Sequence, residues 1–174
     1  MFLDESGFLL VPSVRATWAP RGQTPHLVVA GSWTKISAIS ALSVSPRRKR
    51  VALYLRFHPR ENIRAPQVVR FLRHLLRHLR GPFFLLWDRS RTHRARVVER
   101  LLQRHPRLHP AFFPGYAPEL NPDEFVWTYL KRDLANSLPR DVVQLRRLLD
   151  KPVRRLRHSQ QLLWSCIRAS DLPW

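Results

Sequence analysis

The spacing of apolar residues predicts a chain that begins with strands and continues with alternating helices and strands. Strands are indicated where apolar and polar residues alternate, or where a short apolar run lies between turn-forming residues. On this pattern, strands are predicted at residues 2–10, 26–30, 35–44, 50–57, 83–87 and 108–113. The run Phe-Phe-Leu-Leu-Trp at residues 83–87 has no polar interruption, which is typical of a central strand buried on both faces.

Helices are predicted where apolar residues recur three and four positions apart. In residues 65–80, Val68, Leu72 and Leu75 follow this spacing, and a Gly-Pro pair ends the segment. Further helices are predicted at residues 92–104, 121–137, 141–157 and 159–169. Strands first, then helix–strand crossovers, predict an α/β fold in which helices cover both faces of a mixed sheet. The length suits one domain, residues 1–174, with residues 139–174 as a C-terminal helical extension.

The charge of the chain is strongly positive. Lys plus Arg total 31 against 12 Asp plus Glu, a formal net charge of +19, and nearly all of the basic residues are arginines. Such an excess predicts a polyanionic partner, and the planar guanidinium fork suits phosphate. The alternative is an arginine-rich surface that is merely solvated.

The rest of the composition indicates an intracellular protein. The single cysteine, Cys166, lies in an apolar helical segment and excludes a disulfide within the chain. No apolar run approaches the roughly 20 residues needed to cross a bilayer, so no membrane is expected. The first residues do not have the pattern of a secretory signal. We therefore expect a cytoplasmic location.

Two aspartates lie in a predicted strand or directly after one. Asp88 directly follows the apolar run 83–87, and Asp4 lies in the first strand. A buried strand that ends in Asp delivers a carboxylate to the edge of the sheet where α/β proteins bind ligands. The alternative is that each Asp closes its strand as a turn or cap residue.

Glu124 has two readings from local pattern alone. Asn121 is a good N-cap, Pro122 suits the first helical position, and Glu124 then falls at N3, which makes a capping box. The same placement fixes Glu124 on the first turn of a helix that follows the last strand, where it can be a metal ligand. One carboxylate does not readily serve both purposes.

Three blocks in order carry a family resemblance. They are Asp4-Glu5, then Asp88 with His93, then Tyr-Ala-Pro-Glu-Leu-Asn-Pro-Asp-Glu at 116–124 followed by Trp127, with 35 residues between Asp88 and Glu124. Residues 15–25 also look like the family's segment between its first two strands. The chain resembles the catalytic core of DDE transposases of the mariner-like superfamily, closest to the bacterial insertion-sequence branch.

The resemblance implies a ribonuclease H-like fold with a mixed five-stranded sheet, and a site of three carboxylates. Asp4, Asp88 and Glu124 would be the catalytic residues and would hold two Mg²⁺ or Mn²⁺ ions, with Asp4 bridging both. The implied reaction is strand cleavage at the ends of an element, followed by attack of the freed 3′-hydroxyl on target DNA. The implied partner is DNA, both transposon ends and target, bound by a homodimer on paired ends in the bacterial nucleoid.

Neighbouring acidic residues receive a lesser place. Glu5 should point to the opposite face of the sheet from Asp4 if the strand is regular. Asp123 turns away from Glu124 on the helix, and Glu119, which precedes that helix, is a weaker alternative ligand.

The candidate DNA contacts adjoin Asp88: they are Arg89, Arg91, His93, Arg94 and Arg96. His93 either lies near the scissile phosphate or caps the following helix. Two further groups of arginines, one on the 65–80 helix and one in 146–157, have a solvated helix face as their simpler explanation.

The chain departs from the family pattern in two ways. Arg89 stands where the family usually has Asn, and it could pair with Asp88 and compete with metal. The family's N-terminal helix-turn-helix region does not precede Asp4. Other functions therefore stay open: an inactive remnant that only binds DNA, a metal-dependent nuclease of the same fold, or a basic structural protein that binds nucleic acid.

Overall fold

The computed structural model describes residues 1–11, 16, 18–24, 26 and 34–174, and its centre is one mixed sheet. The strands are β1 (Phe2–Leu9), β2 (Lys35–Val44), β3 (Val51–Pro59), β4 (Phe83–Trp87) and β5 (Leu108–Phe112). Their order is β3-β2-β1-β4-β5. The first three strands are antiparallel, whereas β4 runs parallel to both β1 and β5. The mixed five-stranded sheet is confirmed, and most of the predicted strand at 26–30 lies outside the described residues.

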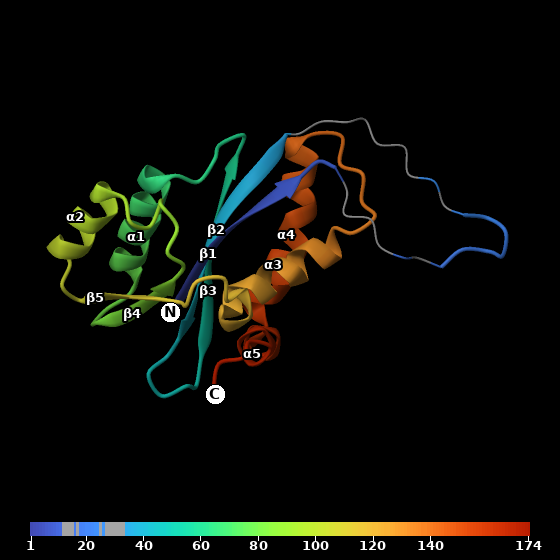
Figure 1. The fold of residues 1–174 in the computed structure, drawn as a ribbon. Coiled ribbons are helices and arrows are strands. Elements are labelled where there is room, and N and C mark those ends of the chain that lie inside the picture. Colours follow the sequence, from blue (N-terminus) through green and yellow to red (C-terminus); the bar gives the residue numbers. More distant parts are fainter. Residues whose placement is uncertain (12–15, 17, 25, 27–33) are drawn as a thin grey trace.

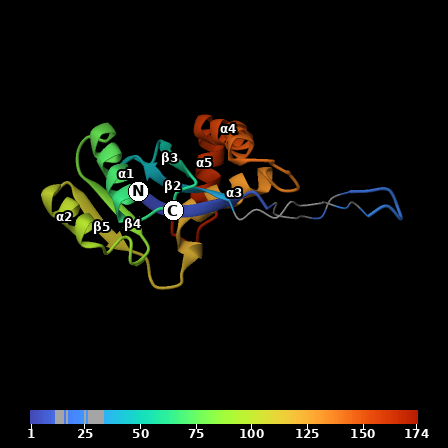
Figure 2. The same ribbon diagram turned by 90° about the horizontal axis from the view of Figure 1, so that it is seen from above.

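Helices cover both faces of this sheet, as the sequence predicts (Figures 1 and 2). They are α1 (Ala65–His78), α2 (Arg96–Arg104), α3 (Pro122–Asp133), α4 (Val142–His158) and α5 (Gln160–Arg168), with a short 3₁₀ turn η1 (Pro118–Leu120) before α3. One face carries α1 and α2, and the other carries α3, α4 and α5. None of the helices in the described ranges has the length and apolarity to cross a membrane.

Each face has its own hydrophobic core, built from alternate residues of the same strands. In β1, Phe2 and Phe8 point toward α3–α5, while Leu3 points toward α1 and α2. Trp127 and Trp87 are among the largest fully buried side chains, one in each core. The 139–174 segment is an integral layer of the domain, because α4 and α5 supply much of the first core.

Several predicted boundaries differ from the observed ones. The helix predicted from residue 92 begins at Arg96, because residues 91–94 form a turn that places His93 in the interior. The helix predicted to reach residue 137 ends at Asp133, and Asn136 just beyond it has a left-handed backbone with φ of 60°. Helix α1 ends at His78, where the Arg107 guanidinium donates to carbonyls at the end of the helix.

The outer edge of β3 is partly occupied by side chains from the C-terminal helices. The Gln160 amide accepts from the Val51 N–H at 2.9 Å and donates to the Val51 carbonyl at 2.8 Å. The Arg157 guanidinium donates to the Leu55 carbonyl at 3.0 Å. These bonds satisfy main-chain groups of β3 that face away from β2.

Candidate active site

The three predicted carboxylates, Asp4, Asp88 and Glu124, line one cleft of about 490 Å³. The remaining wall consists of Arg89, Ser90, Asn121 and the loop 113–118. We call this the acidic cleft. Within the described part of the chain, no three His, Cys, Asp or Glu side chains are grouped closely enough to hold one metal ion between them. The carboxylates therefore share a cavity without forming a closed ligand set.

The sheet register explains why Asp4 and Asp88 meet. Phe2 of β1 lies opposite Leu86 of the parallel strand β4. Asp4 lies two residues after Phe2 in β1, and Asp88, two residues after Leu86, directly follows the end of β4. Adjacent strands lie about 4.8 Å apart, so the two carboxylates are attached to neighbouring positions of the backbone.

Asp4 is held by a tryptophan from the opposite layer. The Trp127 indole N–H donates to Asp4 Oδ2 at 2.8 Å. Burial, together with the charges of Glu124 and Glu5, raises the pKa of Asp4 to about 8, and the Trp127 hydrogen bond opposes the shift. Trp127 follows Glu124 by three positions on α3, so both side chains lie on the same side of the helix. The three-residue spacing of Glu124 and Trp127 in the motif thus indicates that both side chains face the same way. It does not indicate that Trp127 contacts Asp4.

The two readings of Glu124 separate once the start of α3 is seen. The Asn121 side chain caps the helix by accepting from the Asp123 N–H at 3.2 Å. The Asn121 N–H, which a capping box would give to Glu124, instead donates to the Pro118 carbonyl at 2.9 Å. Helix initiation therefore leaves the Glu124 carboxylate available to the acidic cleft.

Asp88 is held by a buried histidine. His93 Nδ1 lies 2.6 Å from Asp88 Oδ1, and the Ser90 N–H donates to the same oxygen at 2.9 Å. These hydrogen bonds lower the pKa of Asp88 to about 2, with His93 making the larger contribution. Asp88 is therefore an anion throughout the neutral range.

His93 also contacts Glu5, which connects the two faces of the sheet. Its Nε2 lies 2.9 Å from Glu5 Oε1, and its ring stacks on Trp87 with centroids 4.3 Å apart. Burial lowers the pKa of His93, but the hydrogen bonds to Asp88 and Glu5 outweigh it and raise the pKa to about 10. His93 is therefore an imidazolium between two carboxylates.

The reading of His93 as a cap is wrong, because the N-cap of α2 is Ala95. The other reading, a position near the scissile phosphate, stays a prediction. The residue is 1% exposed, so its ring faces the interior beside Asp88. Glu5 does point away from the Asp4 face, as strand alternation predicts, yet through His93 it supports Asp88. Sequence reasoning left Glu5 out of the metal set because strand alternation turns it away from Asp4. No local pattern pairs it with His93, which is 88 positions away.

Asp123 is fully buried beneath the acidic cleft. It is 0% exposed, and within the described structure neither of its carboxylate oxygens has a hydrogen-bond partner. Burial, and secondarily the charge of Asp4, hold the pKa of Asp123 well above its ordinary range. Asp123 is not among the residues that line the cleft. Glu119 lies in η1, outside the residues that line the cleft.

Sequence comparison now gives the family. The profile of the family described as DDE superfamily endonuclease matches residues 1–146. The chain belongs to this family. No curated protein sequence gives a significant match.

Solved structures confirm the ribonuclease H-like fold of this chain. The Mos1 transposase paired-end complex with left transposon end is 19% identical with a TM-score of 0.69, and the match covers 96% of this chain and 50% of that one. The catalytic domain of Mos1 mariner transposase is 16% identical with a TM-score of 0.65, and the match covers 96% of this chain and 74% of that one. A simian T-cell lymphotropic virus intasome is 14% identical with a TM-score of 0.51, covering 94% and 60%. The chain spans about half the length of the first of these relatives.

The arginines around Asp88 lie at the surface of the domain. Arg89 is exposed and lines the acidic cleft, and Arg91, Arg94 and Arg96 are exposed along the turn into α2. The Asp88 carboxylate is engaged by His93 and Ser90, and Arg89 extends along the cleft wall beside it. A DNA contact by these arginines stays a prediction.

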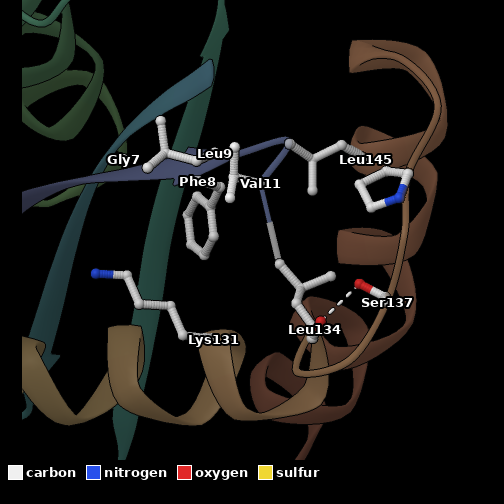
Figure 3. Close-up of a pocket in the computed structure, with 9 residues that line it drawn as sticks. Gly7, Phe8, Leu9, Val11, Lys131, Leu134, Ser137 and Leu145 are labelled. Carbon is white, nitrogen blue, oxygen red and sulfur yellow. Dashed lines mark hydrogen bonds between the residues drawn. The ribbon is translucent and has the colours of Figure 1, made fainter. Parts of the chain in front are cut away.

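A second cavity is apolar and lies at the end of β1. It is about 300 Å³ in volume and lies between β1, the end of α3 and the start of α4 (Figure 3). Phe8, Val11, Leu134 and Leu145 form its walls, and Lys131 is the charged residue at its margin. None of the candidate catalytic residues lines it.

Proposed function

We propose that this chain is the catalytic domain of a DNA transposase that cleaves DNA strands and joins a free 3′-hydroxyl to target DNA. The observation that carries the proposal is the convergence of Asp4, Asp88 and Glu124 on one cleft in a chain of the DDE endonuclease family. The net charge of +19 supports DNA as the partner. Paired transposon ends bound by a homodimer are the assembly that this function would use.

The acidic cleft fits a hard divalent cation. Its candidate ligands are carboxylate oxygens, which Mg²⁺ and Mn²⁺ prefer. The raised pKa of Asp4 means that burial and the neighbouring carboxylates disfavour its anion, which a bound cation would stabilise. Asp4, Asp88 and Glu124 are the residues that would hold the ions. Such ions supply positive charge to the attacking and leaving oxygens of an in-line phosphoryl transfer.

The protein's own groups prepare this chemistry. Trp127 fixes one oxygen of Asp4 and leaves Oδ1 for the cleft. His93 and Ser90 keep Asp88 deprotonated, so a cation meets no competing proton there at neutral pH. Arg89 at the cleft wall is placed to contact a phosphate of the bound strand.

The test is a pair of assays with Mn²⁺ or Mg²⁺. The first measures nicking of supercoiled plasmid, and the second supplies a DNA end with a free 3′-hydroxyl and measures joined product. We expect both activities, each lost in Asp88→Ala and Glu124→Ala and retained in Glu99→Ala, which removes an exposed carboxylate of α2. Nicking without joining would show a nuclease of the same fold. Absence of both, with DNA binding intact, would refute the proposed catalysis.

A further inference from the structure

A basic cleft of about 460 Å³ lies between the outer strand β3 and helix α4. We call it the β3–α4 cleft. Its charged walls are formed by Arg146, Asp150, Arg154 and Arg157 of α4. It shares no lining residue with the acidic cleft. Helix α4 belongs to the layer on the α3–α5 face of the sheet (Figure 2).

The cationic side chains face β3 because of their spacing on the helix. Arg146, Asp150 and Arg154 follow one another at intervals of four, and Arg157 comes three positions later. Residues three and four apart lie on one side of a helix. The group is therefore a stripe along the side of α4 next to β3, and its members do not point to solvent on all sides.

Two of the guanidiniums are held in place before any ligand arrives. Arg146 stacks over the Phe57 ring, 4.4 Å from its centroid, and pairs with Asp150. Arg157 donates to the Leu55 carbonyl at 3.0 Å. Each guanidinium has five N–H donors, so these contacts orient the group and leave donors for a ligand. Such preorganisation reduces the ordering cost of binding.

The cleft has more positive charge than its own residues neutralise. Among the described residues that line it, Asp150 alone is acidic, against three arginines of α4. Arg56 of β3 also lines the cleft, but its charge acts on His74 of α1, on the other face of the sheet. Burial lowers the pKa of Arg157, and the nearby charge of Arg146 lowers it further. Like charges that are held together despite this repulsion gain stability from an anion.

We infer that the β3–α4 cleft binds phosphates of the DNA backbone as a second contact, separate from the acidic cleft. The inference rests on the proposed function for the identity of the polyanion. Leu55 pairs with Ser40, which pairs with Asp4, so the cleft begins two strands from the candidate catalytic site, about 10 Å in backbone terms. The Phe57 ring is covered by Arg146, so the cleft offers a base no stacking surface there. The contact is therefore sequence-independent.

The experiment compares two triple variants that remove equal charge. Arg146→Gln/Arg154→Gln/Arg157→Gln changes the cleft, and Arg77→Gln/Arg100→Gln/Arg104→Gln changes exposed arginines of α1 and α2. Affinity for a duplex without transposon-end sequence is measured in EDTA over a range of salt concentrations. Each lost phosphate contact reduces the salt slope by about 0.9, so the cleft variant should be shallower than wild type by about 2 to 3. The control should change by less than about 1.

Equal slopes for the two triple variants would overturn the inference, since bulk charge alone would then explain binding. Failure of the wild type to bind DNA at all would instead remove the DNA partner of the proposed function. A parallel arm titrates inorganic tripolyphosphate: saturable binding at the cleft with an unchanged DNA slope would identify a free polyphosphate site and also overturn the inference.

A single variant covers the case in which the triple variant does not fold. Arg154→Glu leaves the Arg146 stack and the Arg157 hydrogen bond intact, and its matched control is Arg100→Glu. Circular dichroism and thermal unfolding establish that both are folded. Arg154→Glu should weaken DNA binding at least about fivefold more than Arg100→Glu, and equal weakening would contradict the cleft.

Discussion

The acidic cleft and the β3–α4 cleft hold like charges together by different means. In the acidic cleft, burial raises the pKa of Asp4, a tryptophan N–H holds its carboxylate, and a buried imidazolium keeps Asp88 charged. In the β3–α4 cleft, an aromatic ring and a main-chain carbonyl orient the guanidiniums. The contacts in the acidic cleft set the protonation states of its carboxylates, as the proposed catalysis requires. The contacts in the β3–α4 cleft set only the orientation of the guanidiniums, as the proposed phosphate binding requires. The following predictions test that difference, beginning with the largest effect.

Removal of a carboxylate should abolish cleavage and leave DNA binding unchanged. In Asp88→Ala or Glu124→Ala, we expect metal-dependent nicking to fall at least about 1000-fold, because metal-supplied charge stabilisation is worth several kcal/mol. Affinity for duplex DNA in EDTA should stay within about threefold of wild type, since phosphate binding depends on the arginines. A parallel loss of binding would mean that the two clefts are not separable.

Trp127→Phe should weaken the acidic cleft without emptying it. The ring remains to pack against Phe8, but the N–H that holds Asp4 is lost. Loss of a side chain that orients a metal ligand typically costs about 10–100-fold in metal affinity or activity. A titration of nicking rate against Mn²⁺ concentration would measure this, with Trp164→Phe as the matched control. An unchanged Mn²⁺ requirement would contradict the assignment of Asp4 as a ligand.

The His93 pairs should give the protein a pH-dependent stability. The folded pKa of His93 is about 10 against an ordinary 6.5, so its stabilisation is fully present below pH 6.5 and is lost as the pH rises through 10. Asp88, at about 2 against 3.8, contributes above pH 3.8 and loses its contribution as the pH falls through 2. Denaturant unfolding of wild type and His93→Gln should differ by about 2 kcal/mol near pH 6.

The difference between wild type and His93→Gln should shrink steadily between pH 6.5 and 10. His78→Gln changes an exposed histidine of α1 and serves as the control. Its free energy of unfolding should depend on pH as that of the wild type does. A difference that is constant across this range would show that His93 stabilises by packing on Trp87 alone.

Arg89→Asn should produce the smallest change. Because His93 and Ser90 hold Asp88, replacing Arg89 should leave the Mn²⁺ requirement within about twofold and the unfolding free energy within about 0.5 kcal/mol. The salt slope of DNA binding should fall by about 1, and Arg89→Lys should restore it. A large gain in metal affinity would show instead that Arg89 competes with the cation.

The sequence predicted what depends on local pattern and missed what depends on distant contacts. The apolar run 83–87 predicted the strand β4, and the spacing from Val68 to Leu75 predicted α1. Burial of β4 on both faces was wrong, because Leu85 and Trp87 are buried whereas Phe84 is 66% exposed. Asp88 at the end of a strand was placed correctly at an edge of the sheet. The bonds from Trp127 to Asp4 and from His93 to Glu5 were out of reach, since they join residues 123 and 88 positions apart.

The start of α2 shows the same limit. Residues 92–95 have a helical pattern, but the burial of His93 against Trp87 outweighs it and imposes a turn. The metal and catalytic assignments of Asp4, Asp88 and Glu124 remain predictions of the motif, with their shared cleft as support.

The hydrogen bonds from Gln160 and Arg157 to β3 also affect the tendency of the chain to aggregate. An outer strand with unsatisfied amides and carbonyls is a template on which a foreign strand can add, and such addition leads to aggregation. Here Val51 and Leu55, four residues apart and facing the same way, are already engaged by side chains of the chain's own C-terminal helices. The helical layer thus opposes intermolecular extension of the sheet.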